Sequence, residues 1–197
     1  MENQVDEPGW PMGDPVVWHE VAPRDGLQNE SATLNVQQKL ELLRLLVSCR
    51  PNSIEVTSFV RPDRVPQLAD ADQLCECLNR QEWAHAARDM GILFGGLLAN
   101  QRGLERLLAA NLDSATLLVS ATDSHSQANV GMSRTAASEE MARLIKEAKS
   151  AGLHVRAYVS MAFVCPFEGV VDPAPVLDLM AQFFQSGADV VIPADTL

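Results

Sequence analysis

An alternation of short apolar runs with longer amphipathic segments extends through this chain and limits the folds that it can adopt. The apolar runs have the length and composition of strands, and they fall at residues 16–21, 53–59, 91–98, 114–120, 154–160 and 189–192. The segments between them repeat apolar residues three or four positions apart, which indicates helices. Strands that alternate with helices are typical of α/β proteins with a parallel sheet. We count about six strand–helix units of this kind.

Capping residues and polarity set the expected limits of several helices and loops. Asn35, with Gln38 three residues later, predicts a capping box at the start of one helix. Residues 69–83 have a helical pattern, and Ser138, which two glutamates follow, is expected to cap a later helix. The polar stretch at residues 120–133 is predicted to be a loop after the fourth strand.

The stretch from Val16 to Glu30 places polar chemistry directly after a strand. Its first residues predict a short buried strand, which Pro23 ends because proline has no N–H for the ladder. Arg24, Asp25 and Gln28 follow at once. In α/β proteins, ligands bind at the carboxyl ends of strands. The alternative is an ordinary polar turn with a surface Arg–Asp pair.

Glu55 lies inside the apolar strand predicted at residues 53–59. An unpaired carboxylate is costly to bury, so Glu55 either faces solvent on an edge strand or has a partner inside the protein. In a parallel barrel the strands are covered on both sides. In that case Arg24 is the partner that we expect.

The composition describes a globular protein and argues against two kinds of partner. Apolar residues make up 47% of the 197 residues and charged residues 21%, with a formal net charge of −11 and no basic run. We therefore expect neither nucleic acid nor a membrane as a partner. An anionic ligand would have to be bound by local arginines.

Residues 1–15 are acidic and lack an apolar core. We expect a flexible N-terminal extension that is neither a signal peptide nor a transit peptide, and hence a cytoplasmic protein. The cysteines agree with this location. Cys75 and Cys77 do not have the spacing of a zinc site, so reduced, unpaired thiols are predicted.

Three segments resemble the 3-hydroxy-3-methylglutaryl-CoA lyase family. EVAPRDGLQNE at 20–30 resembles the opening motif of these lyases, IEVTSFV at 54–60 their second strand, and VRAYVSMAFVCPFEG at 155–169 a later segment. The chain departs from the family at Ala22 and Ala194, where the lyases have glycine. It departs again at Ile192, where they have a small polar residue.

The resemblance implies an α/β fold of the TIM (β/α)8 barrel type, with residues 16–197 forming a partial barrel domain. A closed barrel has eight units and typically about 250 residues, against about six units here. The implied reaction is the cleavage of 3-hydroxy-3-methylglutaryl-CoA to acetyl-CoA and acetoacetate, a step of leucine degradation and ketone body metabolism. The implied cofactor is divalent magnesium or manganese, the implied partner is an acyl-CoA, and the expected assembly is a homodimer.

The resemblance also implies roles for individual residues. Arg24, Asp25 and Glu55 are the catalytic candidates, and Asp25 is the metal ligand among them. Arg24 would stabilise charge on the thioester, and Glu55 would orient Arg24. The implied substrate contacts are made by Arg24 and by four more polar residues, Gln28, Tyr158, Asp195 and Thr196.

Other elements of the family have no counterpart in this sequence. By resemblance, two histidines and an asparagine complete the metal site, and a glycine-rich loop provides a catalytic cysteine, all from later strands. We therefore expect a fragment or a truncated form, with Cys165 a structural residue. Two alternatives stay open, namely a related acyl-CoA lyase or aldolase and an inactive truncated form that acts through association.

Overall fold

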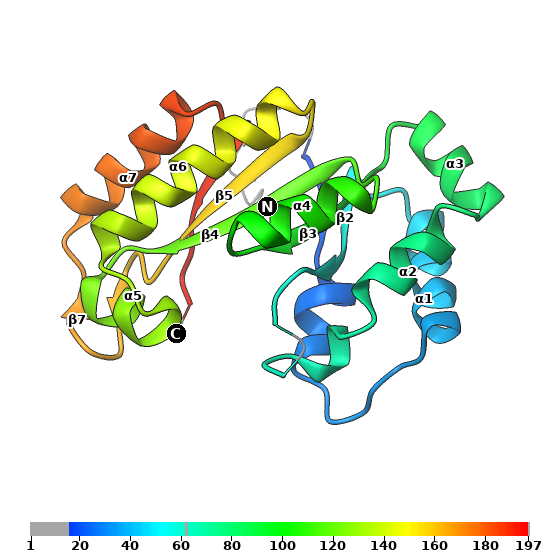
Figure 1. The fold of residues 1–197 in the computed structure, drawn as a ribbon, viewed down its shortest axis with the longest axis horizontal. Helices are drawn as coiled ribbons and strands as arrows, with labels where there is room; N and C mark the ends of the chain where they lie inside the picture. The colour runs from blue at the N-terminus through cyan, green and yellow to red at the C-terminus, as the bar shows by residue number, and fades with distance from the viewer. Residues whose placement is uncertain (1–15, 62, 197) are drawn as a thin grey trace, which may run out of the picture.

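One parallel sheet of six strands is the centre of the structure, a computed structural model that describes residues 16–61 and 63–196 (Figure 1). The sheet order is β1-β2-β3-β4-β5-β8, and every neighbouring pair is parallel. Its strands are β1 (His19–Glu20), β2 (Ser53–Ser58), β3 (Leu93–Leu98), β4 (Ser114–Ser120), β5 (His154–Ser160) and β8 (Val190–Pro193). A small antiparallel hairpin of β6 (Val164–Cys165) and β7 (Gly169–Val170) follows β5.

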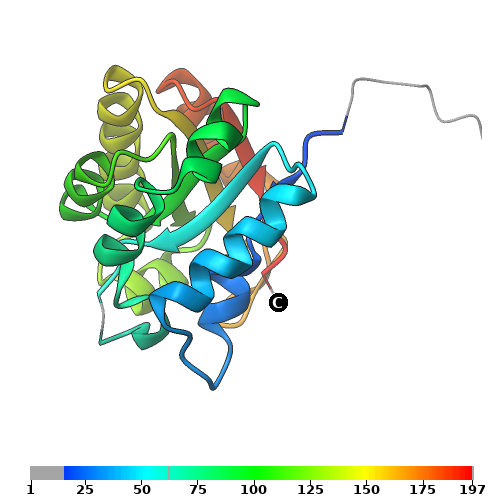
Figure 2. The ribbon, with the colours of Figure 1, turned by 90° about the vertical axis from the view of Figure 1, so that its right-hand side faces the viewer.

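Helices connect the strands and follow the outer side of the curved sheet (Figures 1 and 2). They are α1 (Val36–Ser48), α2 (Ala71–Leu78), α3 (Glu82–Asp89), α4 (Gln101–Ala109), α5 (Asp123–Val130), α6 (Arg134–Ser150) and α7 (Pro173–Gln185), with a π-helical turn η1 (Ala22–Gly26) and a 3-10 turn η2 (Pro66–Leu68). The result is a half-barrel, as expected for an incomplete TIM barrel. The predicted extension at residues 1–15 lies outside the described residues. Within the described ranges, no helix is long and apolar enough to cross a membrane.

Apolar and polar residues alternate along the central strands, and this alternation separates two faces of the sheet. Successive side chains of a strand point to opposite faces. Ile54, Phe94, Leu117 and Val155 belong to the apolar set, which is buried against the helices in one core. The polar set includes Ser53, Glu55, Thr57, Thr116, Arg156 and Tyr158. The inner face of the half-barrel therefore presents polar side chains.

The predicted capping box is confirmed at the start of α1. The side-chain oxygen of Asn35 accepts a hydrogen bond from the backbone N–H of Gln38 at 3.0 Å, and the backbone N–H of Asn35 donates to the Gln38 side chain at 3.0 Å. Leu40, Leu43 and Val47 then face the core. This packing fixes α1 against the sheet beside the first two strands.

The first strand is shorter than the sequence predicts. Val16, Val17 and Trp18 are 92%, 64% and 42% exposed, and only His19 and Glu20 form β1. In the described part of the chain β1 is an edge strand with β2 as its one neighbour. The prediction of a buried strand from Val16 was therefore wrong, because no second element covers these apolar side chains.

Tertiary contacts change three of the expected helix limits. Residues 69–83 form parts of two helices because the chain turns at Asn79, whose side chain donates to the carbonyl of Ala110 at 2.8 Å. The predicted loop at residues 120–133 contains α5, which ends at Gly131 in the left-handed conformation. Ser133 caps α6, and Ser138 lies inside that helix.

Gly95 in β3 is the register partner of Glu55 in β2. A substitution at Gly95 therefore tests how tightly the strands are packed beside Glu55. A Cβ on Gly95 would lie 2.1 Å from Oγ of Ser114 and 3.0 Å from its carbonyl oxygen. Gly95→Ala should lower the free energy of unfolding by about 1–3 kcal/mol, as overpacking does. Urea denaturation checks this. Gly26→Ala is the control, since its Cβ would meet only Ala22 at 3.6 Å; equal stabilities of the two variants would contradict the prediction.

Candidate functional site

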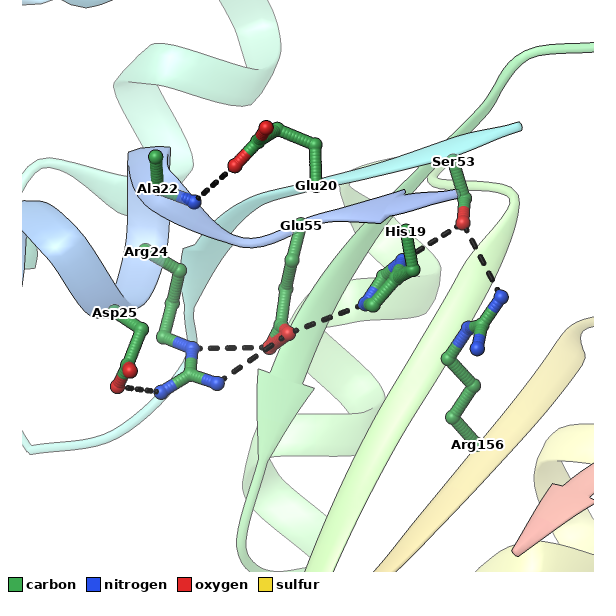
Figure 3. Close-up of polar contacts among 8 residues, drawn as sticks. All are labelled: His19, Glu20, Ala22, Arg24, Asp25, Ser53, Glu55 and Arg156. Carbon is green, nitrogen blue, oxygen red and sulfur yellow. Dashed lines mark hydrogen bonds and ion pairs between the residues drawn. The ribbon is translucent and has the colours of Figure 1, made fainter. Parts of the chain in front are cut away.

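Glu55 is the centre of the candidate site. Its side chain is 0% exposed and lies in the middle of β2, where all six residues are buried. A buried carboxylate without partners would strongly destabilise the fold. The partners come from two other parts of the chain, from the turn after β1 and from β1 itself (Figure 3).

Arg24 reaches Glu55 from η1. The backbone N–H groups of Arg24 and Asp25 both donate to the carbonyl of Val21, at 3.0 and 2.7 Å, which closes the turn directly after β1. The Nε of Arg24 then donates to Oε1 of Glu55 at 3.1 Å, and its Nη2 donates to Oε2 at 3.4 Å. The predicted pairing of Arg24 with Glu55 is confirmed, and the edge-strand alternative for Glu55 was wrong.

Asp25 is the more open carboxylate of the site. Its side chain is 52% exposed, and its Oδ1 accepts a hydrogen bond from Nη1 of Arg24 at 2.6 Å. Magnesium and manganese require several oxygen or imidazole ligands. Within residues 16–61 and 63–196, no group of three or more His, Cys, Asp or Glu side chains is arranged to hold a metal ion. The described residues therefore do not fit a complete divalent-metal site.

A second polar group lies on the other side of Glu55. Nε2 of His19 is 3.6 Å from Oε2 of Glu55, and Nδ1 of His19 is 2.7 Å from Oγ of Ser53. Nη2 of Arg156 in turn donates to the same Ser53 hydroxyl at 3.3 Å (Figure 3). Ser53 and Arg156 are 2% and 7% exposed, so this group is inside the half-barrel.

Sequence reasoning did not single out His19, Ser53 or Arg156. The alternation of polar and apolar residues in β2 and β5 was the available signal, because it places Ser53 and Glu55 on one face of β2. The same pattern places Arg156 and Tyr158 on one face of β5. It does not show that the two strands approach each other across the inner face.

The other predicted substrate contacts occupy different surroundings. Tyr158 is partly buried on β5, and burial, followed by the charge of Glu55, raises the pKa of its phenol. Gln28 is partly buried just after η1. Asp195 and Thr196 are exposed after β8, where the Thr196 hydroxyl accepts the backbone N–H of Met161 at 2.8 Å. Their roles as substrate contacts stay predictions.

Cys165 has an unusual thiol for a residue predicted to be structural. Burial by itself would raise its pKa, but hydrogen bonds with the Thr122 hydroxyl and with the backbone of Phe167 and Glu168 outweigh burial and lower the pKa. A low pKa favours the reactive thiolate. The side chain is nevertheless buried in the hairpin beside Thr122, whose Oγ1 lies 3.1 Å from Sγ. This position favours the structural role.

Comparison with known proteins places this arrangement in a family. The family model described as HMGL-like matches residues 15–197. The chain belongs to the HMGL-like family. It is 32% identical over 187 residues to a hydroxymethylglutaryl-CoA lyase of Bacillus subtilis and 36% identical over 179 residues to an (R)-citramalyl-CoA lyase of Chloroflexus aurantiacus.

Solved structures agree with this membership. A hydroxymethylglutaryl-CoA lyase of Acinetobacter baumannii, in complex with coenzyme A and 3-methylmalate, matches with a TM-score of 0.78 and 27% identity, and 89% of this chain is covered. The matches cover 95% and 90% of this chain for the two sequence relatives, but only 60% and 56% of those relatives, and 55% of the A. baumannii chain. The chain thus spans little more than half the length of these HMGL-like proteins.

The surroundings of Tyr158, the only tyrosine of the chain, predict its titration. Its phenol should titrate above the ordinary value of about 10, because burial and the charge of Glu55 disfavour the phenolate. Glu55→Gln should lower this pKa but leave it above the ordinary value. The ultraviolet absorbance of the phenolate measures it, and Glu140→Gln on the outer helix α6 is the control.

The same shift has a defined sign for stability. A folded-state pKa above the unfolded value contributes stability below about pH 10 and loses it as the pH rises through the folded value. A phenol that titrates at or below its ordinary value would contradict the assigned surroundings of Tyr158.

The single open carboxylate predicts weak metal binding by this chain. Mn²⁺ should bind no more tightly than about 10⁻⁴ to 10⁻³ M, the range of weak oxygen-ligand calcium sites. Asp25→Asn should weaken the binding further, while Asp63→Asn on the neighbouring loop should not. Isothermal titration calorimetry measures both effects, and micromolar binding would show that the described residues hold the ion better than one carboxylate can.

Proposed function

We propose that this chain provides the thioester-binding side of a lyase site that cleaves 3-hydroxy-3-methylglutaryl-CoA to acetyl-CoA and acetoacetate. The observation that carries the proposal is the orientation of Arg24 by two carboxylates. A guanidinium has five N–H donors, and the described contacts of Arg24 use three, two to Glu55 and one to Asp25. Two donors, one on each terminal nitrogen, are therefore left for a ligand.

The reaction needs such a donor at the thioester oxygen. Loss of the proton from the tertiary hydroxyl drives cleavage of the neighbouring carbon–carbon bond, and the electron pair moves into the enolate of acetyl-CoA. Negative charge then develops on the thioester oxygen. A preorganised cationic donor at that oxygen stabilises the transition state more than the ground state. Arg24 is suited to this role because its planar guanidinium is always charged.

The other residues have supporting roles in this proposal. Glu55 orients Arg24 from β2, and Asp25 contributes one ligand to a divalent ion when the remaining ligands are supplied. Tyr158, Gln28, Asp195 and Thr196 surround the substrate. The ion would supply positive charge at the substrate oxygens, but the residues described here hold too few ligands for a reaction step to be assigned to it.

A second candidate substrate is supported by the relative from Chloroflexus aurantiacus. That (R)-citramalyl-CoA lyase is 36% identical to this chain, and it is named for a different acyl-CoA. In this chain Ala22, Ala194 and Ile192 stand where the resemblance leads us to expect two glycines and a small polar residue. We propose that these positions decide the acyl group. Comparison of kcat/KM for the two acyl-CoA substrates separates the candidates.

Association is the alternative to catalysis by this chain. We propose a cytoplasmic homodimer. Light scattering measures the mass in solution. A chain that associates but does not cleave either acyl-CoA would match the inactive form that acts through association.

Arg24→Gln tests the catalytic proposal. In the full-length enzyme with excess Mg²⁺ or Mn²⁺, kcat for acetyl-CoA release should fall by about 10²- to 10³-fold, because charge on the thioester oxygen is no longer stabilised. KM should change much less. Arg143→Gln, which removes a surface arginine of α6 paired with Glu140 and Glu147, is the matched control. Near-normal turnover of Arg24→Gln would rule out its assigned role.

A further inference from the structure

His19 has one ring nitrogen whose role the hydrogen bonds do not explain. Nε2 is buried and has no hydrogen-bond partner among the described residues. Its one charged neighbour in the described ion pairs is Oε2 of Glu55 at 3.6 Å, slightly beyond hydrogen-bond distance. Because Nε2 is buried and faces a carboxylate, a proton on Nε2 is favoured over a lone pair there.

The contacts on both sides of the ring bear on its protonation state. Arg156 has only donors, so its Nη2 must donate to Oγ of Ser53. The Ser53 hydroxyl proton is then available for its second neighbour, Nδ1 of His19, at 2.7 Å. A neutral ring that accepts at Nδ1 carries its proton on Nε2. The Ser53 oxygen could instead accept from Nδ1–H with its second lone pair, but that tautomer would set the lone pair of Nε2 against the Glu55 carboxylate at 3.6 Å. We therefore assign the proton to Nε2, where it faces Glu55.

We propose that His19 is a positioning residue of the site, in which the Ser53 hydroxyl and the Glu55 carboxylate together keep the proton on Nε2, and in which this N–H attracts Glu55 toward the orientation that binds Arg24. A protonated ring would present the same N–H to Glu55. These contacts form a chain of side chains that runs from Arg156 through Ser53, His19 and Glu55 to Arg24, and we call this chain of contacts the relay (Figure 3). Its effect on turnover rests on the function proposed above, but its geometry does not.

The position of Arg156 explains why a relay is needed. Its Nε is buried without a hydrogen-bond partner, and within the described ranges its guanidinium has no carboxylate in an ion pair. Its charge reaches Glu55 through space and through two neutral hydrogen-bonding groups. Partners that orient metal-ligating side chains typically change activity by about 10- to 100-fold when they are removed, and we expect an effect of that order for His19.

Nitrogen NMR of the wild-type chain tests the relay without an activity assay. Two-bond ¹H–¹⁵N spectra at alkaline pH should show the neutral His19 ring as one Nε2–H tautomer, with Nδ1 at the shift of a hydrogen-bond acceptor. His19→Gln identifies the signals by their loss. Ser53→Ala should return Nδ1 to the shift of an acceptor without a donor. A proton on Nδ1 in the wild type, or an unchanged Nδ1 shift in Ser53→Ala, would overturn the proposal.

The Nε–H resonance of Arg24, assigned with Arg24→Lys, tests the positioning. His19→Phe keeps a ring but has no N–H, so this resonance should move toward that of a free arginine. His19→Gln supplies an amide N–H and should retain the wild-type resonance, as should His85→Phe on the exposed face of α3. Thermal unfolding checks that each variant is folded. An unchanged Arg24 resonance in folded His19→Phe would contradict the role.

Kinetics then separates the relay from the lyase function. Acetyl-CoA release by His19→Phe should show kcat reduced about 10- to 100-fold, with KM less affected and with most of the loss recovered in His19→Gln. A wild-type full-length enzyme without cleavage would remove the proposed function and leave the NMR result to decide the relay. A wild-type kcat in His19→Phe would overturn the positioning role alone.

Discussion

The buried ion pair between Glu55 and Arg24 is the interaction on which the rest of the structure depends. Removal of one partner of a buried pair typically costs about 3–5 kcal/mol, because the remaining charge is left without compensation. Glu55 is 0% exposed, so the turn after β1 must bring Arg24 to it. The π-helical turn and the buried ring of Pro23 serve this requirement. The buried charge of Glu55 on β2 thus explains why the backbone forms the turn η1 directly after β1.

The outer face of the sheet contributes to the apolar core, and the inner face carries the polar side chains of the candidate site. Ile54 and Val56 face the helices and belong to the core, whereas Ser53 and Glu55, which alternate with them, take part in the polar group. A substitution on the outer face changes packing, and one on the inner face changes electrostatics. Arg24 contacts Glu55 of β2, Arg156 contacts Ser53 of β2, and His19 lies beside both. Strand β2 therefore connects the contributions of β1 and β5 to the site.

The sequence predicted the parts of the structure that local physics determines. Strands β4 and β5 have the predicted limits, and the Arg24–Glu55 pair followed from the cost of a lone carboxylate in an apolar strand. Contacts between distant segments escaped prediction. Helix α5 lacks an apolar face, and its N-terminus is tied to the hairpin by a bond from the Ser124 N–H to Glu168. Arg156 and Ser53 meet across 103 positions of sequence, for which no periodicity gives a signal.

The charges of the site show why the second arginine belongs to it. Arg24 contacts two carboxylates, Glu55 and Asp25, so these three residues alone carry one excess negative charge. Such a group would repel the enolate that the proposed reaction forms, in a chain whose net charge is already −11. Arg156 brings the sum of the four charges to zero, and its field raises the electrostatic potential at Glu55 through a medium of low dielectric constant. The buried guanidinium therefore offsets the open carboxylate of Asp25, and it leaves the free donors of Arg24 facing a site of balanced charge.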